Sequence, residues 1–115
     1  MTNPMEDKRK APRIPVNFEV SFTFESREHQ ARALNLSADG MFIQTKYLLL
    51  QNDLIEIYFS LPENPEPLWM KARVAWYSRV EGEGAPVSGI GVQFLDPLPS
   101  QRDALESYLR HLLKN

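Results

Sequence analysis

The sequence contains no cysteine, so it offers neither a disulfide framework nor a thiolate metal site. Its two histidines, His29 and His111, lack the close spacing that would place both on one helix face as metal ligands. No apolar run approaches the length of about 18 residues that a membrane span needs, and no apolar stretch follows the charged amino terminus. We therefore expect a cytoplasmic chain with no membrane span and no metal.

Signatures of catalysis are also scarce. The sequence has no glycine-rich loop of the Walker or Rossmann type, and Gly82 and Gly84 are flanked by glutamates that would repel a phosphate. Ser37 and Ser88 lack the sequence surroundings of an activated nucleophile. The chain is therefore expected to be a binding module rather than an enzyme, and to need no cofactor.

The charges are unevenly distributed. At 115 residues, 43% of them hydrophobic, the chain suits one globular domain with a modest core. Residues 1–13 carry four Lys or Arg against two acidic residues, whereas residues 14–115 carry nine against thirteen. A general nucleic-acid binder would show a basic stripe across its folded surface. Cationic charge confined to one short arm instead favours a small anionic ligand.

The arm, residues 1–13, is expected to be extended and flexible, because prolines within and just after it disfavour a helix. Arg9 and Arg13 would then lie about 13 Å apart along the backbone, close enough for their side chains to converge on one ligand. Guanidinium groups bind phosphate oxygens or the O6/N7 edge of guanine bidentately. Lys8 and Lys10 are accessory candidates that would steer an anion toward the arm. The alternative is a solvated tail that binds nothing.

Beyond the arm, apolar and polar residues alternate with the period of a β-strand in four segments: 16–24, 54–61, 69–80 and 90–95. A weaker strand is expected over residues 31–36 and a short one over residues 41–45. In the fifth of these six segments, residues 69–80, the alternation places four residues on one face: Met70, Ala72, Val74 and Trp76. Asp39 and Gly40 separate two segments, at a point where a positive φ is often required. Short links without helices indicate a mainly β domain over residues 14–98, either an antiparallel barrel or a sandwich.

Residues 99–115 change to a helical period. Leu105, Tyr108 and Leu109 recur at intervals of three and four, and Ser100 with Asp103 resembles a capping box. The segment is predicted to be an amphipathic helix. It would either cover one end of the β-structure or offer a surface to a partner helix or to a second copy of the chain.

Two short motifs then combine. Arg9 and Arg13 form Arg-x-x-x-Arg, and after one strand Asn35, Ser37 and Gly40 form Asn-x-Ser-x-x-Gly. In this order and on this strand pattern, the motifs resemble those of the PilZ domain, a bacterial receptor family for the second messenger cyclic di-GMP. The resemblance covers nearly the whole chain and includes the closing helix and three further segments: 40–43, 73–76 and 89–94.

The resemblance implies a six-stranded antiparallel β-barrel with a carboxy-terminal helix, and a ligand held outside the barrel. It implies that Arg9 and Arg13 contact guanine and phosphate. It also implies that Asn35 and Ser37 hydrogen-bond a guanine, with the Asn35 carbonyl oxygen facing the N–H groups of the pairing edge. Gly40 would serve backbone geometry. An ordinary turn, in which Asn35 and Ser37 bond only their own backbone, is the alternative.

The sequence therefore predicts a bacterial cyclic di-GMP receptor. Its arm is expected to become ordered on binding, and the signal to pass to a separate protein or to a second copy. One alternative is a PilZ-like adaptor that binds protein and no nucleotide. Another is a small barrel that binds single-stranded nucleic acid, which the acidic net charge of residues 14–115 opposes.

Overall fold

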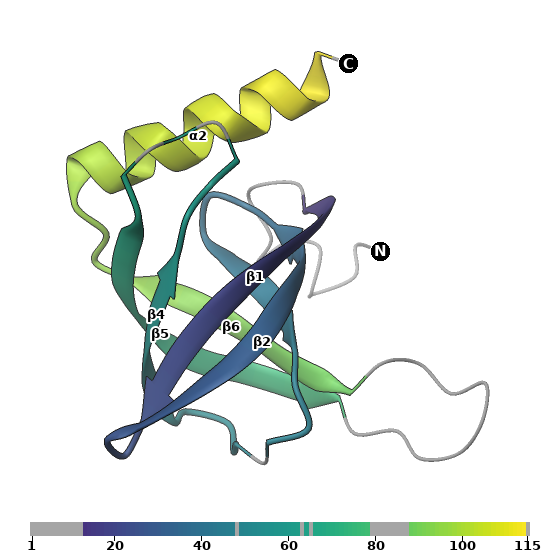
Figure 1. The fold of residues 1–115 in the computed structure, drawn as a ribbon, viewed down its shortest axis with the longest axis vertical. Helices are drawn as coiled ribbons and strands as arrows, with labels where there is room; N and C mark the ends of the chain where they lie inside the picture. Colours follow the sequence, from purple (N-terminus) through teal and green to yellow (C-terminus); the bar gives the residue numbers. More distant parts are fainter. Residues whose placement is uncertain (1–12, 48, 63, 65, 79–87, 115) are drawn as a thin grey trace, which may run out of the picture.

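The computed structural model describes residues 13–47, 49–62, 64, 66–78 and 88–114. Within these residues the chain forms six strands: β1 (Ile14–Phe24), β2 (Arg27–Leu36), β3 (Gly40–Gln44), β4 (Leu54–Phe59), β5 (Leu68–Ser78) and β6 (Gly89–Leu95). All neighbouring pairs are antiparallel, and the sheet closes into a barrel in the order β1-β2-β3-β6-β5-β4. A helix, α2 (Pro99–Leu113), lies across one end of the barrel (Figure 1). The predicted six-stranded antiparallel barrel with a carboxy-terminal helix is thus confirmed.

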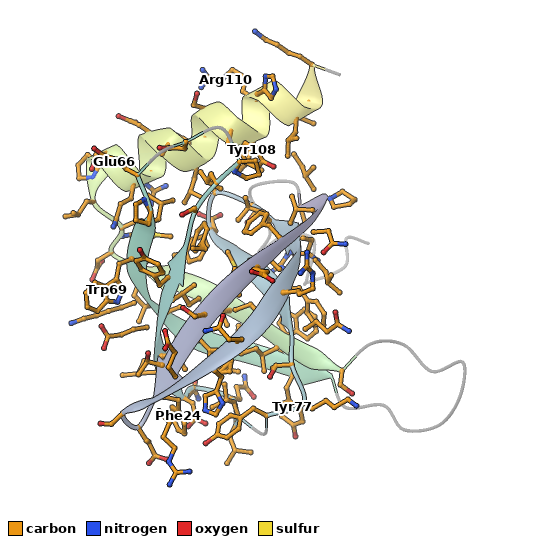
Figure 2. All side chains as sticks on the ribbon, viewed as in Figure 1. Phe24, Glu66, Trp69, Tyr77, Tyr108 and Arg110 are labelled. Carbon is orange, nitrogen blue, oxygen red and sulfur yellow. The ribbon has the colours of Figure 1, made fainter. Side chains whose placement is uncertain are left out.

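The barrel interior is filled by one face of each strand. Its buried side chains include the alternating apolar residues of the first, fourth and fifth segments: Val20, Phe22, Ile55, Ile57, Phe59, Met70, Ala72 and Val74. Helix α2 adds Leu105 and Leu109 to the same core. Figure 2 shows Tyr108 on the side of α2 that faces the barrel and Arg110 on the opposite side. The helix therefore closes one end of the core. Among the described residues, no helix is long and apolar enough to span a membrane.

The start of α2 differs from the prediction. The cap residue is Leu98, and Pro99 follows it at the first helical position, where the missing N–H costs nothing. The Gln101 side chain accepts the Leu98 N–H at 2.9 Å and donates to the Trp69 carbonyl oxygen at 2.8 Å. The predicted capping pair of Ser100 and Asp103 is wrong, because Gln101 caps the helix and ties it to β5.

Strand β5 contains a bulge that reverses its alternation. Val74 pairs with Val92 on β6, but the next register pair is Trp76 with Gly91, so Ala75 is an extra residue. Because side chains alternate along a strand, one extra residue moves everything after it to the other face. The prediction that Trp76 shares the face of Met70, Ala72 and Val74 is therefore wrong. Its side chain is 36% exposed, whereas Val74 is fully buried.

A second bulge lies on β2. Ala33 pairs with Ile43 of β3, and Asn35 pairs with Phe42, which leaves Leu34 as the extra residue. Ala33 and Leu36 are both fully buried, although they stand three positions apart and a regular strand would place them on opposite faces. The bulge thus turns Asn35 to the outside of the barrel and keeps Leu36 inside.

Gly40 is required for a close approach rather than for a left-handed turn. Neither Gly40 nor Asp39 has a positive φ, so that expectation is wrong. A Cβ atom built on Gly40 would lie 2.0 Å from the Val92 carbonyl oxygen and 3.1 Å from its carbonyl carbon. Because these are backbone atoms of the neighbouring strand, no side-chain rotation can relieve the contact.

Replacing Gly40 by alanine should therefore lower the free energy of unfolding by about 1–3 kcal/mol, the usual cost of overpacking. Urea unfolding followed by circular dichroism measures the change. Asp39→Ala is the matched control, because Asp39 lies next to Gly40 but is exposed, and shortening its side chain creates no steric contact. Equal stability of Gly40→Ala and the wild type would contradict the close approach to Val92.

Candidate ligand-binding site

The two bulges place a row of residues on the outer surface of the barrel. Asn35 on β2 pairs with Phe42 on β3, Phe42 pairs with Gly91 on β6, and Gly91 pairs with Trp76 on β5. These four residues are successive register partners across four strands. We call them the outer row.

One half of the outer row is aromatic. The rings of Phe42 and Trp76 stack with their centroids 5.2 Å apart and an interplanar angle of 19°. A Cβ atom on Gly91 would lie 2.2 Å from the Trp76 indole, and one on Gly89 would lie 2.5 Å from the Phe42 ring. The two glycines therefore let both rings lie directly on β6. Phe42 is 8% exposed and Trp76 is 36% exposed, so the indole is the surface that a ligand could cover.

This aromatic surface was not predicted from the sequence. The alternation in the fifth segment placed Trp76 on the same face as Val74, and Phe42 was noted only within a short strand. The available signal was the pair of glycines at 89 and 91, because glycine within a strand often marks a place where a neighbouring group approaches closely.

The Asn35 end of the outer row is polar, and Arg13 lies against it. Arg13, directly before β1, donates from Nη1 to Asn35 Oδ1 at 3.0 Å. The Phe42 N–H donates to the same oxygen, also at 3.0 Å. The structure therefore brings Arg13 and Asn35 together, as the two motifs predicted, and joins both to the aromatic half through Phe42. Arg9, Lys8 and Lys10 lie outside the described residues.

Ser37 and Gly40 shape the turn between β2 and β3. The Ser37 hydroxyl oxygen accepts the N–H groups of Asp39 at 3.1 Å and Gly40 at 3.2 Å, and the hydroxyl lies 3.4 Å from the Gly40 carbonyl oxygen. The Ser37 N–H donates to that same carbonyl at 2.9 Å. Ser37 is only 3% exposed. In this geometry its hydroxyl supports the turn and with it the position of Asn35.

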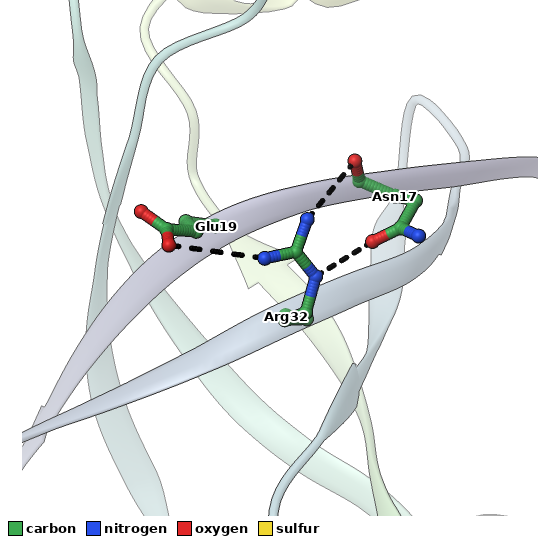
Figure 3. A network of polar contacts seen from close by, with 3 residues as sticks. All are labelled: Asn17, Glu19 and Arg32. Carbon is green, nitrogen blue, oxygen red and sulfur yellow. Dashed lines mark hydrogen bonds and ion pairs between the residues drawn. The ribbon is translucent and has the colours of Figure 1, made fainter.

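A separate network of polar side chains links the outer faces of β1 and β2 (Figure 3). Arg32 donates from Nε to Asn17 Oδ1 at 2.6 Å, and its Nη1 lies 3.8 Å from a Glu19 carboxylate oxygen. Arg32 pairs with Glu19, just after the irregular stretch of β1 between Pro15 and Phe18, whereas Arg13 lies before that stretch. Its ion pair is exposed, so it should add little stability. The network helps to fix the path by which the chain enters β1.

Chemically, this surface suits a planar ligand that carries negative charge. A guanidinium can bind a phosphate or a base edge, an amide can hydrogen-bond a base, and an exposed indole can stack on one. Among the residues that the structure describes, no group of three or more His, Asp or Glu side chains could hold a metal ion. The side chains of this surface can offer stacking, hydrogen bonds and positive charge.

The model of the PilZ domain matches residues 7–111. No curated protein sequence matches the chain.

Among solved structures, the Bacillus subtilis inhibitor of motility MotI/DgrA is similar to this chain with a TM-score of 0.76 and 16% identity, over 94% of this chain and 53% of that one. Escherichia coli YcgR in complex with c-di-GMP is similar with a TM-score of 0.67 and 17% identity, over 93% and 46% of the two chains. The separate PilZ domain of YcgR with c-di-GMP gives 0.66 and 16%, over 93% and 95%.

The TM-scores show a shared fold, and at identities of 16–17% the likeness shows the fold alone. The chain spans about half the length of the first solved proteins that it matches. The family match, however, covers most of the sequence and includes both motifs. This chain belongs to the PilZ domain family.

Proposed function

We propose that this chain is a receptor that binds cyclic di-GMP on the outer row. The observation that carries the proposal is the contact of Arg13 and Asn35 beside the exposed face of Trp76. It is supported by the family and by the fold likeness to proteins solved with c-di-GMP from Escherichia coli, Borreliella burgdorferi and Klebsiella pneumoniae. A receptor for this second messenger would act in the bacterial cytoplasm.

Each residue has a distinct proposed role. Arg13 and Arg9 bind phosphate and guanine through their guanidinium groups. Trp76 stacks on a base, since every base presents a π face. Ser37 and Gly40 position the turn that carries Asn35, and Lys8 and Lys10 raise the rate at which the anion arrives.

The mechanism of signalling that we propose is ordering of the arm. Arg13 already contacts Asn35, so the change concerns the residues that precede it. Their charges would be neutralised by the ligand phosphates, which favours a fixed position against the barrel. The altered surface would then be recognised by a separate downstream protein or by a second copy of the chain.

A second candidate function is a protein adaptor that binds no nucleotide. It is favoured by one observation: the Ser37 hydroxyl and Asn35 Oδ1 are both engaged by groups of the protein itself. Motif residues that serve only the fold would show the same contacts. Binding measurements distinguish the two functions.

The first prediction concerns Arg13. Isothermal titration should show binding of cyclic di-GMP and much weaker binding of cyclic di-AMP and GTP. Arg13→Ala should weaken binding by about ten- to a hundredfold, because a charge-assisted contact contributes about 1.5–3 kcal/mol. Arg32→Ala is the matched control, since Arg32 contacts Asn17 and Glu19 away from the outer row. No heat from the wild type at high ligand would support the adaptor instead.

The second prediction concerns the two tryptophans, which lie at opposite ends of β5. Trp76→Leu should weaken cyclic di-GMP binding by about tenfold, because base stacking on an aromatic side chain contributes about 1–3 kcal/mol. Trp69→Leu should leave the affinity unchanged, although Trp69 is 62% exposed. Equal effects of the two substitutions in the same titration would count against the outer row as the binding surface.

The third prediction concerns the arm. Hydrogen exchange at saturating cyclic di-GMP should slow in residues 8–15, while residues 20–24 of β1, which already pair with β2, serve as the internal control. Unchanged exchange in residues 8–15, in a sample that titration shows to be saturated, would rule out arm ordering as the signal.

A further inference from the structure

The outer face of β4 and β5 carries two large aromatic side chains that the chain itself leaves open. Tyr58 and Trp69 are register partners on these strands, and they are 49% and 62% exposed. Figure 2 shows Trp69 projecting outward from the barrel. Leu98, also exposed, borders Trp69, because Gln101 binds both the Leu98 N–H and the Trp69 carbonyl oxygen. Exposed aromatic residues gathered in one place are typical of a protein interface.

The next row on the same face carries one charge of each sign. Glu56 on β4 and Lys71 on β5 are register partners. Each stands two positions from the aromatic residue of its strand and therefore points to the same outer face. Within the described part of the chain, neither Glu56 nor Lys71 forms an ion pair, so both charges are available to a partner. We call these four residues the β4–β5 patch: Glu56, Tyr58, Trp69 and Lys71.

From this pattern we infer that the β4–β5 patch binds a second copy of the chain, related by a two-fold axis that runs parallel to the strands, between β4 and β5. Rotation about this axis places β4 of one copy over β5 of the other. Tyr58 then faces the partner's Trp69. Glu56 faces the partner's Lys71, and the symmetry repeats both contacts. Stacking of two sheets with their strands nearly aligned is a common arrangement.

The charges favour a second copy over other partners. A partner surface of a single sign, such as a nucleic acid or a basic peptide, would gain one attraction on the patch and one repulsion. A second copy meets the opposite charge at both positions. The patch is smaller than the roughly 20–30 residues that each side of a standard interface contributes, so the dimer is weak and forms as the protein concentration rises.

This dimer goes beyond the proposed function. The β4–β5 patch contains no residue of the outer row, and its contacts need no nucleotide. The inference can therefore fail while the binding of cyclic di-GMP stands, and the reverse also holds. The two are measured separately, since association is followed here in the absence of ligand.

Charge reversal at the patch tests the inference. Glu56→Lys gives the patch two positive charges and Lys71→Glu gives it two negative charges, so each variant should repel its own copy. The dissociation constant of each homodimer should rise about tenfold or more. A mixture of the two variants has opposite charges at every contact and should form a heterodimer at least as tightly as the wild type forms its homodimer. A substitution that merely damaged its own chain could not give this recovery.

Sedimentation velocity of the full chain over a range of micromolar concentrations measures the dimer fraction. Glu106→Lys and Arg110→Glu are the matched controls, because they make the same charge changes on the exposed side of α2. Each control should dimerise like the wild type, and mixing the two should add nothing. The inference is overturned by a wild type that stays monomeric, by patch variants that dimerise normally, or by a control mixture that associates as tightly as the patch mixture.

Discussion

The period-two alternation of a β-strand, interrupted at two places, is the constraint on which this surface depends. Without an extra residue at Leu34, Asn35 would point into the core and Leu36 would face solvent. Without an extra residue at Ala75, Trp76 would likewise point inward. The two bulges stand on strands that flank β3 and β6, and they bring both side chains to the same level of the outer face. Bulges commonly re-aim side chains next to functional sites, and here two of them cooperate.

Strand β6 is the floor on which this arrangement lies. Two aromatic rings can rest on it because Gly89 and Gly91 present no side chain. A third glycine, Gly40, lets the start of β3 approach the backbone of β6 at Val92. Glycine within a strand costs conformational entropy, about 0.5–1 kcal/mol relative to alanine. Three such residues on two adjacent strands show that this side of the barrel needs close packing of backbone and aromatic rings against β6.

Much of the fold could be predicted from the sequence, because the barrel needs only an apolar face on each strand and short links between strands. The residues that fill the core of β1 and β4 follow directly from their alternation. The position of Trp76 could not be predicted in this way, because the extra residue at Ala75 resembles any other small residue in a strand. The prediction of the cap of α2 was wrong for a similar reason. The Gln101 side chain is held at the cap by its hydrogen bond to the carbonyl oxygen of Trp69, which is distant in sequence.

The candidate site was predictable in part. The motifs identified Arg13 and Asn35, and the structure brings them into contact. The orientation of the Asn35 amide depends on the Phe42 N–H, and therefore on the register between β2 and β3. Neither motif contains that information. The buried position of Ser37 likewise follows from the tight turn around Gly40 and not from the residue type.

The placement of the two tryptophans also has an optical consequence. One indole lies on the outer row and is 36% exposed, and the other lies near the start of α2 and is 62% exposed. Emission from Trp76 will respond to anything that covers the outer row, while Trp69 supplies a background tied to the helix. With Trp69 replaced by phenylalanine, the remaining signal would come from a single site. The protein thus carries its own fluorescent reporter of that surface, and no external label is needed.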